Sequence, residues 1–577
     1  MARLNDTVEA ALIEYADLLS ILTDDPYKPR SYEKAARAVG GYPDDLAAMD
    51  PKEILKIPSV GKSIGEKIDE LVRTGSFEAL EELRAQIPPG VREMTAIPGL
   101  GPKKAILLYR DLGIADVEQL AQAVEQGRLA DVKGFGAKTE ENIRRGIERM
   151  SQSTGRVLVS DAMDLADQFI HRLGSRKDVR RIEFAGSLRR MAETIGDLDL
   201  LVASDDVAGV MEAFTSDGMT ERVLARGETK SSILTRKGLQ VDLRVVPLEA
   251  WGAAMIYFTG SKAHNIRLRE MAIRKGLRLN EYGLFRVKSG KLIVAETEEE
   301  VYERLGLPFI PPTLREDRGE IEAALAGELP KVLEQRDMRG DLHTHTNLTD
   351  GLAPLEEMLQ AAAAMKYAYY AVTDHAPQLF MQRMTDEKML AQRDRLRGLQ
   401  ATYPSMTLLH GSELNIDPQG GVDWPEEFLA GFDVLVASVH THFNLSKDEM
   451  TRRIIRAMEN PYVNILGHPT ARLIGKRPPI EFDLEEVFRA AARTGTALEV
   501  NGFPDRLDLK DEHILWARRH GVKFAADTDS HASLHLSHMR FAVAMAQRGW
   551  LTKDDVINAW PLAKLRRFLD KGRSTAR

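Results

Sequence analysis

Residues 186–201, GSLRRMAETIGDLDLL, join a Gly-Ser turn, a basic segment and a Gly-Asp-x-Asp motif that continues into an apolar strand. Side chains alternate along a strand, so Asp197 and Asp199 point to the same side. Two carboxylates held this close repel each other unless a cation lies between them. Asp242, in a second apolar run at 241–246, can supply a third ligand from a neighbouring strand. Three carboxylates around two divalent ions, roughly 3.5–4 Å apart, form the arrangement used for in-line phosphoryl transfer.

The other residues of this stretch fit a triphosphate. Gly186 and Ser187, just before an expected helix start, offer backbone N–H groups and a hydroxyl to a phosphate. Arg190 can neutralise the rest of the triphosphate, and Gly196 completes the Gly-Asp-x-Asp motif. The alternative is a capped helix, a turn and an edge strand with solvated acids, which would be the better interpretation of a lone Asp-x-Asp. The order of these motifs favours nucleotidyl transfer.

The composition limits the possible classes of protein. A chain of 577 residues should form several domains. It has no cysteine, which excludes disulfides and thiolate metal sites and fits a reducing compartment. We find no signal peptide and no apolar run of roughly 18 residues, and therefore expect a soluble, cytoplasmic protein with no membrane partner. The net charge of -8 excludes a chain that is basic throughout but allows DNA binding by a local basic surface.

Three Gly-containing turns of similar pattern lie in the first 150 residues, at 57–68, 97–105 and 132–139. Each is followed by a basic first turn of a helix, and its free N–H groups can bind a DNA phosphate without recognising bases. One such turn could equally be a plain helix connector, but three copies predict sequence-independent DNA binding. The predicted DNA-binding residues are Gly61, Gly65, Gly99, Gly101, Lys103, Lys104, Gly134, Gly136 and Lys138.

Histidines are concentrated in the C-terminal part, where 12 of the 14 lie between His343 and His538. Six of them, with two aspartates and a glutamate, stand at or just after the ends of apolar, strand-like runs that alternate with helical segments. This alternation predicts an α/β barrel that displays ligands at the carboxyl ends of its strands. A lone histidine in such a place is more often a satisfied core residue, but the repetition predicts a multinuclear metal site.

These motifs resemble those of a known family. Residues 186–201 resemble the nucleotidyltransferase palm of family X DNA polymerases, and nearly the whole chain resembles bacterial family X polymerases with a C-terminal PHP (polymerase and histidinol phosphatase) domain. The resemblance implies a multidomain α+β and α/β fold, with helix-hairpin-helix domains, a beta-type palm and a distorted (β/α)7 barrel. The implied divisions are an N-terminal lyase-like helical domain at 1–85, a helix-hairpin-helix subdomain at 86–150, the palm at 151–248, a nucleotide-selection subdomain at 249–316, a linker at 317–337 and the PHP domain at 338–577.

The resemblance also implies roles for single residues. Asp197, Asp199 and Asp242 would be catalytic ligands of Mg²⁺ or Mn²⁺, and Lys67 would be the Schiff-base lysine of a 5′-deoxyribose phosphate lyase. The residues expected to contact the incoming nucleotide are Tyr257, Phe258, Gly260 and Asn265. The nine PHP positions, which would bind Mn²⁺ or Zn²⁺, fall on His343, His345, Asp350, His375, Glu413, His440, His468, Asp529 and His531. Near them, Arg472 and Arg506 could hold a scissile phosphate.

The resemblance implies a DNA repair enzyme with two activities. The first is a DNA polymerase that fills short gaps. Its partners would be gapped or nicked DNA and dNTPs, and the protein would be a monomer. The second is a metal-dependent 3′–5′ exonuclease, abasic-site endonuclease and 3′-end phosphoesterase. One alternative makes the PHP part the main enzyme and the polymerase half a holder of DNA ends. A non-catalytic DNA-binding scaffold with structural metals is the other alternative, which complete ligand sets disfavour.

Overall fold

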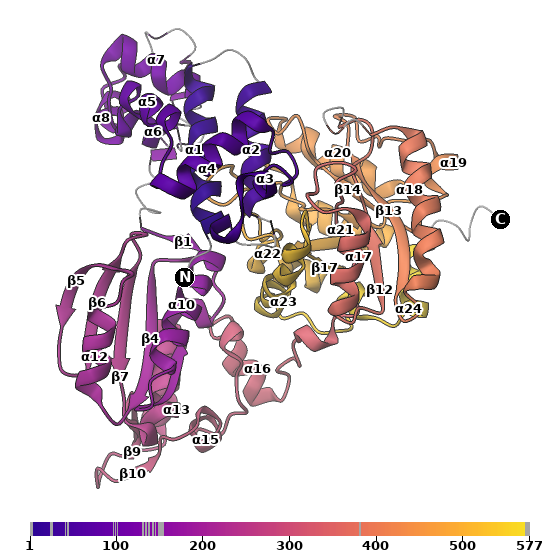
Figure 1. Cartoon of the computed structure of the whole chain (residues 1–577). Helices are drawn as coiled ribbons and strands as arrows, with labels where there is room; N and C mark the ends of the chain where they lie inside the picture. The colour runs from indigo at the N-terminus through magenta and orange to yellow at the C-terminus, as the bar shows by residue number, and fades with distance from the viewer. Residues whose placement is uncertain are drawn as a thin grey trace.

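The computed structural model folds into an N-terminal helical part, a palm sheet with attached helices and a C-terminal barrel (Figure 1). It describes residues 4–22, 27–40, 42, 46–95, 97, 100, 102–129, 132, 135–136, 139–140, 143–144, 146–147, 155–379, 382 and 384–571. Within these ranges, no helix combines the length and the apolar character needed to span a bilayer.

The N-terminal part consists of short helices around one apolar core. The elements are α1 (Leu4–Leu22), α2 (Tyr27–Gly40), η1 (Leu46–Ala48), α3 (Pro51–Ile54), α4 (Lys62–Thr74), α5 (Glu78–Gln86), α6 (Pro89–Met94), α7 (Pro102–Leu112) and α8 (Val117–Glu125). Val8, Leu12 and Tyr15 recur at helical spacing along α1 and are buried. α3 begins at Asp50, whose carboxylate accepts hydrogen bonds from two backbone N–H groups in a capping box. α4 begins directly after Gly61, so the first predicted hairpin leads into a helix.

The palm is a five-stranded sheet in the order β2-β4-β7-β6-β5. Its elements are β1 (Val157–Leu158), α10 (Val159–Gly174), β2 (Val179–Phe184), α11 (Gly186–Arg189), β3 (Thr194–Ile195), β4 (Asp197–Ser204), α12 (Val207–Thr215), β5 (Thr220–Arg226), β6 (Lys230–Thr235) and β7 (Gln240–Val245). Leu198, Leu200 and Val202 of β4 enter the core, so the acids that alternate with them face the other side. β4 and β7 are parallel, and their register places Asp199 beside Asp242.

A second group of helices follows the palm and packs on a small sheet in the order β10-β9-β8. The elements are η2 (Leu248–Ala250), α13 (Trp251–Thr259), α14 (Lys262–Arg274), β8 (Leu277–Asn280), β9 (Gly283–Arg286), β10 (Leu292–Val294), α15 (Glu298–Arg304), η3 (Pro312–Leu314), α16 (Glu320–Ala326) and η4 (Gln335–Asp337). Ile321 and Ala324 of α16 share an apolar core with Leu268 and Tyr302. The charged helical segment before the barrel is therefore packed against the polymerase half.

The C-terminal part is a nearly closed barrel of seven parallel strands, which confirms the predicted fold class. Strands β11 (Gly340–Asp341), β12 (Tyr369–Val372), β13 (Thr407–Asn415), β14 (Val434–Ser438), β15 (Ile465–Leu466), β16 (Ala497–Asn501) and β17 (Phe524–Asp527) pair in chain order. The helices are α17 (Leu355–Ala364), α18 (Asp386–Leu399), η6 (Gln400–Thr402), α19 (Glu426–Leu429), α20 (Lys447–Glu459), α21 (Leu484–Thr494), α22 (Asp511–Arg519), η7 (Ser533–His538), α23 (Met539–Arg548), η8 (Ile557–Ala559) and α24 (Leu562–Leu569). A parallel bridge between Thr344 and Ser530 joins the first and last strands just past their ends.

Several contacts tie the barrel to the other parts. Ion pairs join Asp164 of α10 to Arg540 of α23 at 3.6 Å, and Arg318 of the linker to Asp511 of α22 at 3.0 Å. Leu352 of the barrel is buried in the apolar core of the N-terminal helices. The parts therefore form one assembly with polar and apolar junctions.

The first barrel strand tolerates no side chain at Gly340. A Cβ atom there would lie 2.2 Å from the carbonyl oxygen of Tyr369 on the paired strand. We expect Gly340→Ala to lower the free energy of unfolding of the barrel by roughly 1–3 kcal/mol because of overpacking. Chemical denaturation followed by tryptophan fluorescence tests this, since four of the five tryptophans lie in this part of the chain.

The matched control is Gly398→Ala, in the last turn of α18, where an added Cβ meets open space. Because alanine is the better helix former, this variant should unfold at the same or slightly higher denaturant concentration than the wild type. Equal unfolding midpoints for Gly340→Ala and the wild type would contradict the expected clash.

Candidate active sites

The palm brings its three predicted metal ligands together on neighbouring parallel strands. Asp199 lies directly opposite Asp242, and Asp197 is exposed at the start of β4. Burial, and after it the carboxylates of Asp197 and Asp242, raise the pKa of Asp199 to about 7. Lys230 Nζ lies 2.6 Å from Asp242 Oδ2. An ammonium group thus sits where the acids need positive charge.

The pKa of Asp242 is shifted in the opposite direction to that of Asp199. Burial works to raise the pKa of its carboxyl group, but hydrogen bonds from Lys230 and Gln240 outweigh burial and lower the pKa. The Gln240 amide donates to Asp242 Oδ1 at 2.9 Å. One predicted ligand is therefore held ionised, while its neighbour Asp199 is about half protonated near pH 7 in the metal-free protein, so a divalent cation would compete with a proton there.

The Gly-Ser turn lies against this acidic group. Gly186 has a φ of +60°, and an added Cβ there would lie 2.3 Å from Asp199 Oδ2. Glycine is needed at this position both for the backbone conformation and for the close approach of Asp199. Ser187 follows in the short helix α11 and is partly exposed, and Gly196 precedes Asp197 on the other side of the loop.

Arg190 connects the Gly-Ser turn to the end of α13. Its Nη1 donates to the carbonyl oxygen of Thr259 at 2.6 Å, and its Nε donates to Glu316 at 3.0 Å. Gly260 follows Thr259 with a φ of +71°, and an added Cβ there would lie 3.3 Å from Arg190 Nη1. The structure therefore brings together the predicted phosphate and sugar contacts from two separate motifs.

The remaining predicted nucleotide contacts lie on α13 and α14. Tyr257 is exposed, and its ring packs edge-on against Phe258 with centroids 5.0 Å apart. Asn265 is buried and donates from Nδ2 to the carbonyl oxygen of Tyr257 at 2.7 Å. Arg244 of β7 stacks on Phe258 at 4.6 Å, so this aromatic pair is fixed to the palm sheet.

The predicted DNA-binding residues are described only in part. Gly61 stands before α4 with open space around it, whereas Gly65 is buried and an added Cβ would lie 2.6 Å from Leu55. Gly136 is also open, and Lys104 lies 5.6 Å from the ring of Phe135. The positions outside the described residues are Gly99, Gly101, Gly134 and Lys138, and the side chain of Lys103 is likewise not described.

Lys67 is partly exposed on α4, one turn after the first hairpin. Its ammonium group lies 3.3 Å from the hydroxyl of Ser63 and 5.9 Å from the centre of the Tyr32 ring. The N-terminal domain thus presents this lysine at its surface.

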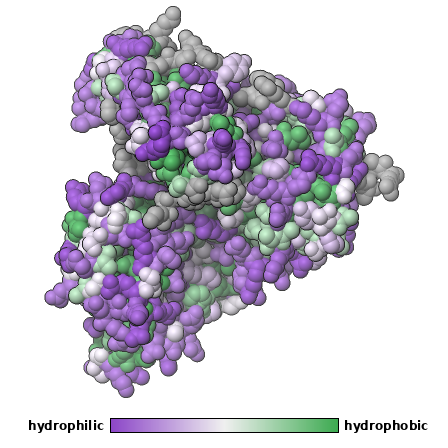
Figure 2. Space-filling model, in the orientation of Figure 1, coloured by the Kyte–Doolittle hydropathy of each residue, from purple (hydrophilic) through white to green (hydrophobic). Residues whose placement is uncertain are grey.

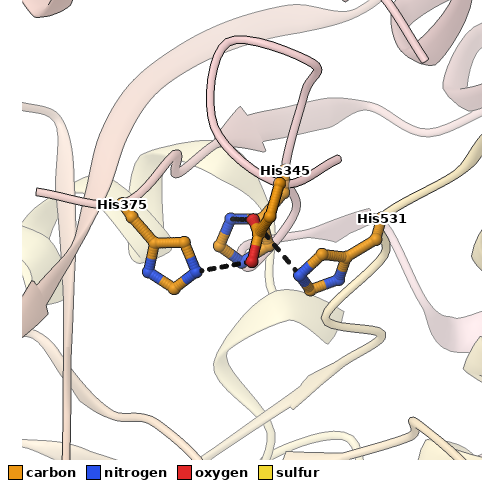
Figure 3. A group of neighbouring side chains, drawn as sticks. His345, His375 and His531 are labelled. Atoms are coloured by element: carbon orange, nitrogen blue, oxygen red, sulfur yellow. Dashed lines mark hydrogen bonds and ion pairs between the residues drawn. The ribbon is translucent and has the colours of Figure 1, made fainter. Parts of the chain in front are cut away.

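The barrel gathers all nine predicted PHP ligands at the carboxyl ends of its strands. Figure 3 shows His345, His375 and His531, from three loops, pointing toward one another. These three histidines and Asp350 form one group of possible metal ligands. His375 Nε2 lies 3.2 Å and His531 Nε2 lies 3.5 Å from that carboxylate. Two further groups, with donor atoms within 4.8 Å of one another, are His343, His345 and Asp529, and His375, Glu413 and His440.

Glu413 lies at the centre of the barrel site. It also contacts His468, the predicted ligand that is in none of the three groups above. Its Oε1 is 2.9 Å from His468 Nε2 and 3.0 Å from His440 Nε2. Although burial works to raise the pKa of Glu413, the imidazoles of His440, His375 and His343 lower it well below its usual range. The buried carboxylate is thus compensated only by the histidines around it in the described structure.

The donor set fits divalent cations. Among the described residues, Nε2 of His343 and both ring nitrogens of His345 are buried without a hydrogen-bond partner. Unpaired buried imidazole nitrogens are costly, and they are the donors that Mn²⁺ and Zn²⁺ accept. Residues shared between the three groups, such as His345 and His375, indicate more than one ion.

A carboxylate that sequence reasoning missed orients two of these ligands. Glu499 Oε1 lies 2.6 Å from His343 Nδ1, and Oε2 accepts a hydrogen bond from the backbone N–H of His468. Holding Nδ1 leaves Nε2 of His343 free to face the site. Glu499 lies in the middle of β16 and not at the end of an apolar run, where the predicted ligands stand, so its position offered no comparable sign in the sequence. Asn415 holds Nδ1 of His440 in the same way at 2.7 Å.

The two arginines near this site have different surroundings. Arg506 Nε lies 3.3 Å from Asp529, and its Nη1 is buried without a partner in the described structure. Arg472 points away from the ligands, toward the palm, and contacts Glu193. His410, outside the predicted set, stacks on Phe432 instead, and burial lowers its pKa to about 3, assisted by nearby arginines.

The palm and the barrel together define a nucleotidyltransferase fused to a metal-dependent phosphoesterase. Comparison with known proteins agrees. Matching family models are a helix-hairpin-helix domain at 3–77, a SAM-like helix-hairpin-helix tandem at 91–149, the DNA polymerase beta thumb at 254–316 and the PHP domain at 341–502. The chain belongs to the bacterial family X DNA polymerases that carry a C-terminal PHP domain.

The relatives cover either the whole chain or the barrel. The DNA polymerase/3′-5′ exonuclease PolX of Bacillus subtilis (strain 168) is 34% identical over 551 residues, which are 95% of this chain and 96% of that protein. A probable phosphatase of Thermoanaerobacter sp. (strain X514) is 30% identical over 241 residues, 40% of this chain and 93% of the relative. A probable phosphatase of Acetivibrio thermocellus is 32% identical over 206 residues, 34% of this chain and 80% of the relative.

The raised pKa of Asp199 predicts a pH-dependent gain in stability for Asp199→Asn. In the metal-free protein, ionised Asp199 costs folding energy, and this cost grows from the usual pKa of 3.8 up to about 7 and then levels off. The variant should therefore unfold at a higher temperature than the wild type, with a gain of at least about 1 kcal/mol at pH 8 and a smaller gain at about pH 5. Thermal unfolding in a chelator measures this, and a difference independent of pH would contradict it.

Glu499→Gln should weaken metal binding in the barrel. Glutamine has one acceptor oxygen for the three donors that Glu499 now holds, which are His343, the backbone N–H of His468 and the amide of Asn501, so the orientation of His343 or the loop of His468 is lost. We expect a fall of about 10-fold to 100-fold in affinity for Mn²⁺. Calorimetric titration of the chelator-treated protein tests this. The exposed Glu485→Gln on α21 is the control and should bind as the wild type, and equal affinity of both variants would show that Glu499 orients nothing.

Proposed function

We propose that this protein is a DNA-directed DNA polymerase that also removes nucleotides from 3′ ends. The single observation that carries the proposal is the presence of two separate metal-ligand centres in one chain, three carboxylates in the palm and nine ligands in the barrel. Membership of the family X polymerases with a PHP domain supports both activities.

In the palm, Asp197, Asp199 and Asp242 would hold Mg²⁺ or Mn²⁺. Bound cations would neutralise the triphosphate and make the primer 3′ hydroxyl more acidic. Arg190 would exchange Glu316 for a phosphate oxygen, next to Gly186 and Ser187. The primer 3′ oxygen then forms a bond to the α-phosphorus, and the bond to pyrophosphate breaks.

Tyr257 and Phe258 would pack on the nucleotide, with the Gly260 backbone close to its sugar. Asn265 supports this surface, because its amide holds the carbonyl oxygen of Tyr257. These residues would orient the nucleotide toward the three carboxylates.

In the barrel, the nine ligands would hold Mn²⁺ or Zn²⁺, which would supply an activated water for phosphoester hydrolysis. Arg506 would bind the phosphate through its free Nη1. The same chemistry would extend to abasic sites and to 3′-blocking groups, because each presents a phosphoester. The positions and burial of the ligands support this assignment.

DNA would be held by the N-terminal helices through its backbone, so binding would be tolerant of sequence and would weaken with salt. Figure 2 shows a mainly hydrophilic face, with a hollow between the N-terminal helices and the palm. We further propose that gapped or nicked DNA is the partner and that the protein acts as a monomer in the cytoplasm. The proposal includes the division of the chain into domains, with boundaries after residues 85, 150, 248, 316 and 337.

Lys67 is the proposed nucleophile of a 5′-deoxyribose phosphate lyase. The lysine is partly exposed beside Tyr32 and Ser63, where a 5′ end could reach it. Attack on the abasic sugar requires the neutral amine.

A single assay separates the two centres. The substrate is 5′-phosphorylated DNA with a one-nucleotide gap in Mn²⁺, with and without dNTPs. Asp242→Ala should lose at least about 100-fold of primer extension, because a ligand of the cations is gone, and should keep shortening. His343→Ala should keep extension and lose shortening by a similar factor. Gel analysis of primer length measures both.

The outcomes distinguish the alternatives. If the wild-type primer is never extended, the polymerase half holds DNA ends and the barrel is the enzyme. Loss of both activities in either variant would show that the halves do not act separately. A wild-type protein that neither extends nor shortens the primer would support a non-catalytic scaffold.

A further inference from the structure

An ion pair joins the polymerase palm to the loop beside the barrel site. Arg472 Nη2 lies 2.8 Å from Glu193 Oε2, although the residues are 279 positions apart. Glu193 belongs to the loop between α11 and β3, and Arg472 to the loop after β15. The side chain of Arg472 is only 10% exposed. An ion pair this shielded is costly to break on one side, because the remaining charge stays buried.

Arg472 also holds a segment of the barrel. Its Nε donates to the carbonyl oxygen of Arg506 at 2.8 Å, and its Nη2 donates to the carbonyl oxygen of Leu507. Leu507 has a φ of +39°, a conformation that residues other than glycine rarely adopt. Such a residue keeps its conformation only when its surroundings hold it. The guanidinium of Arg472 is therefore part of what fixes residues 506–507.

The fixed segment presents Arg506 to the barrel site. Arg506 Nε lies 3.3 Å from Asp529, and Nη1 is buried without a partner in the described structure. A guanidinium nitrogen left free beside metal ligands is placed to bind a phosphate oxygen. Its position depends on the backbone that Arg472 holds.

We propose that Glu193 of the palm is a positioning residue for hydrolysis in the barrel. Glu193 orients Arg472, and Arg472 holds the segment from which Arg506 reaches the terminal phosphodiester. This inference rests on the exonuclease function proposed above. A residue of the polymerase half, next to the loop expected to bind the nucleotide, would thus support hydrolysis in the barrel.

The test compares Glu193→Gln with the wild type on single-stranded DNA in Mn²⁺. We expect kcat/KM for 3′-nucleotide removal to fall about 10-fold to 100-fold, because the variant displaces Arg506 by up to about 1 Å. Mn²⁺ affinity should stay as in the wild type, which separates the loss of rate from a loss of metal, whereas the melting temperature should fall because the shielded Arg472 loses its counter-charge. Glu193→Asp should recover part of the rate. In an Arg506→Gln background, Glu193→Gln should cause no further loss, since it acts through Arg506.

The control is Asp164→Asn, which breaks another ion pair between the palm and the barrel, at 3.6 Å from Arg540. It should leave the rate unchanged. An unchanged rate for Glu193→Gln would overturn the inference, as would an equal loss in both variants or a further loss in the Arg506→Gln background. If the wild type shortens the DNA and His343→Ala does not, the exonuclease activity is established. This conclusion does not depend on the result for Glu193→Gln.

Discussion

The structure depends on the placement of charged and metal-binding groups where water cannot solvate them. In the palm, burial and the carboxylates of Asp197 and Asp242 raise the pKa of Asp199 to about 7. In the barrel, Glu413 and the surrounding imidazoles are buried, and several ring nitrogens have no hydrogen-bond partner in the described structure. Divalent cations would relieve both costs, so the crowded charges of each candidate site would favour metal binding.

Parallel strands bring the candidate ligands together in both halves. Because the carboxyl ends of parallel strands lie at one edge, ligands from distant parts of the chain meet there. The barrel does this with seven strands, whereas in the palm the three carboxylates lie near the amino ends of the parallel pair β4 and β7. The apolar residues that alternate with the ligands hold each strand in its register, so the core fixes the spacing of the ligands.

The three parts of the molecule share supports. Leu352 and Ala532, each next to or near a ligand of the barrel site, are buried in the core of the N-terminal helices. Arg548 of the barrel donates to the carbonyl oxygen of Arg190 at 2.7 Å and contacts Glu316 at 2.8 Å. The loop that would hold the triphosphate is therefore supported from the barrel, and the loops that carry barrel ligands are supported by the DNA-binding part. This arrangement links the positions of the two sites.

The sequence by itself determined the classes of the parts and most candidate ligands, because those depend on local patterns. Asp197 and Asp199 follow from strand alternation, and the barrel ligands follow from polar residues at the ends of apolar runs. Tertiary structure alone decided which residues support them. Glu499 looks like any strand residue until His343 lies beside it, and Arg472 was expected at a phosphate but contacts Glu193 instead. Such roles arise from contacts between segments far apart in the chain, which no local pattern contains.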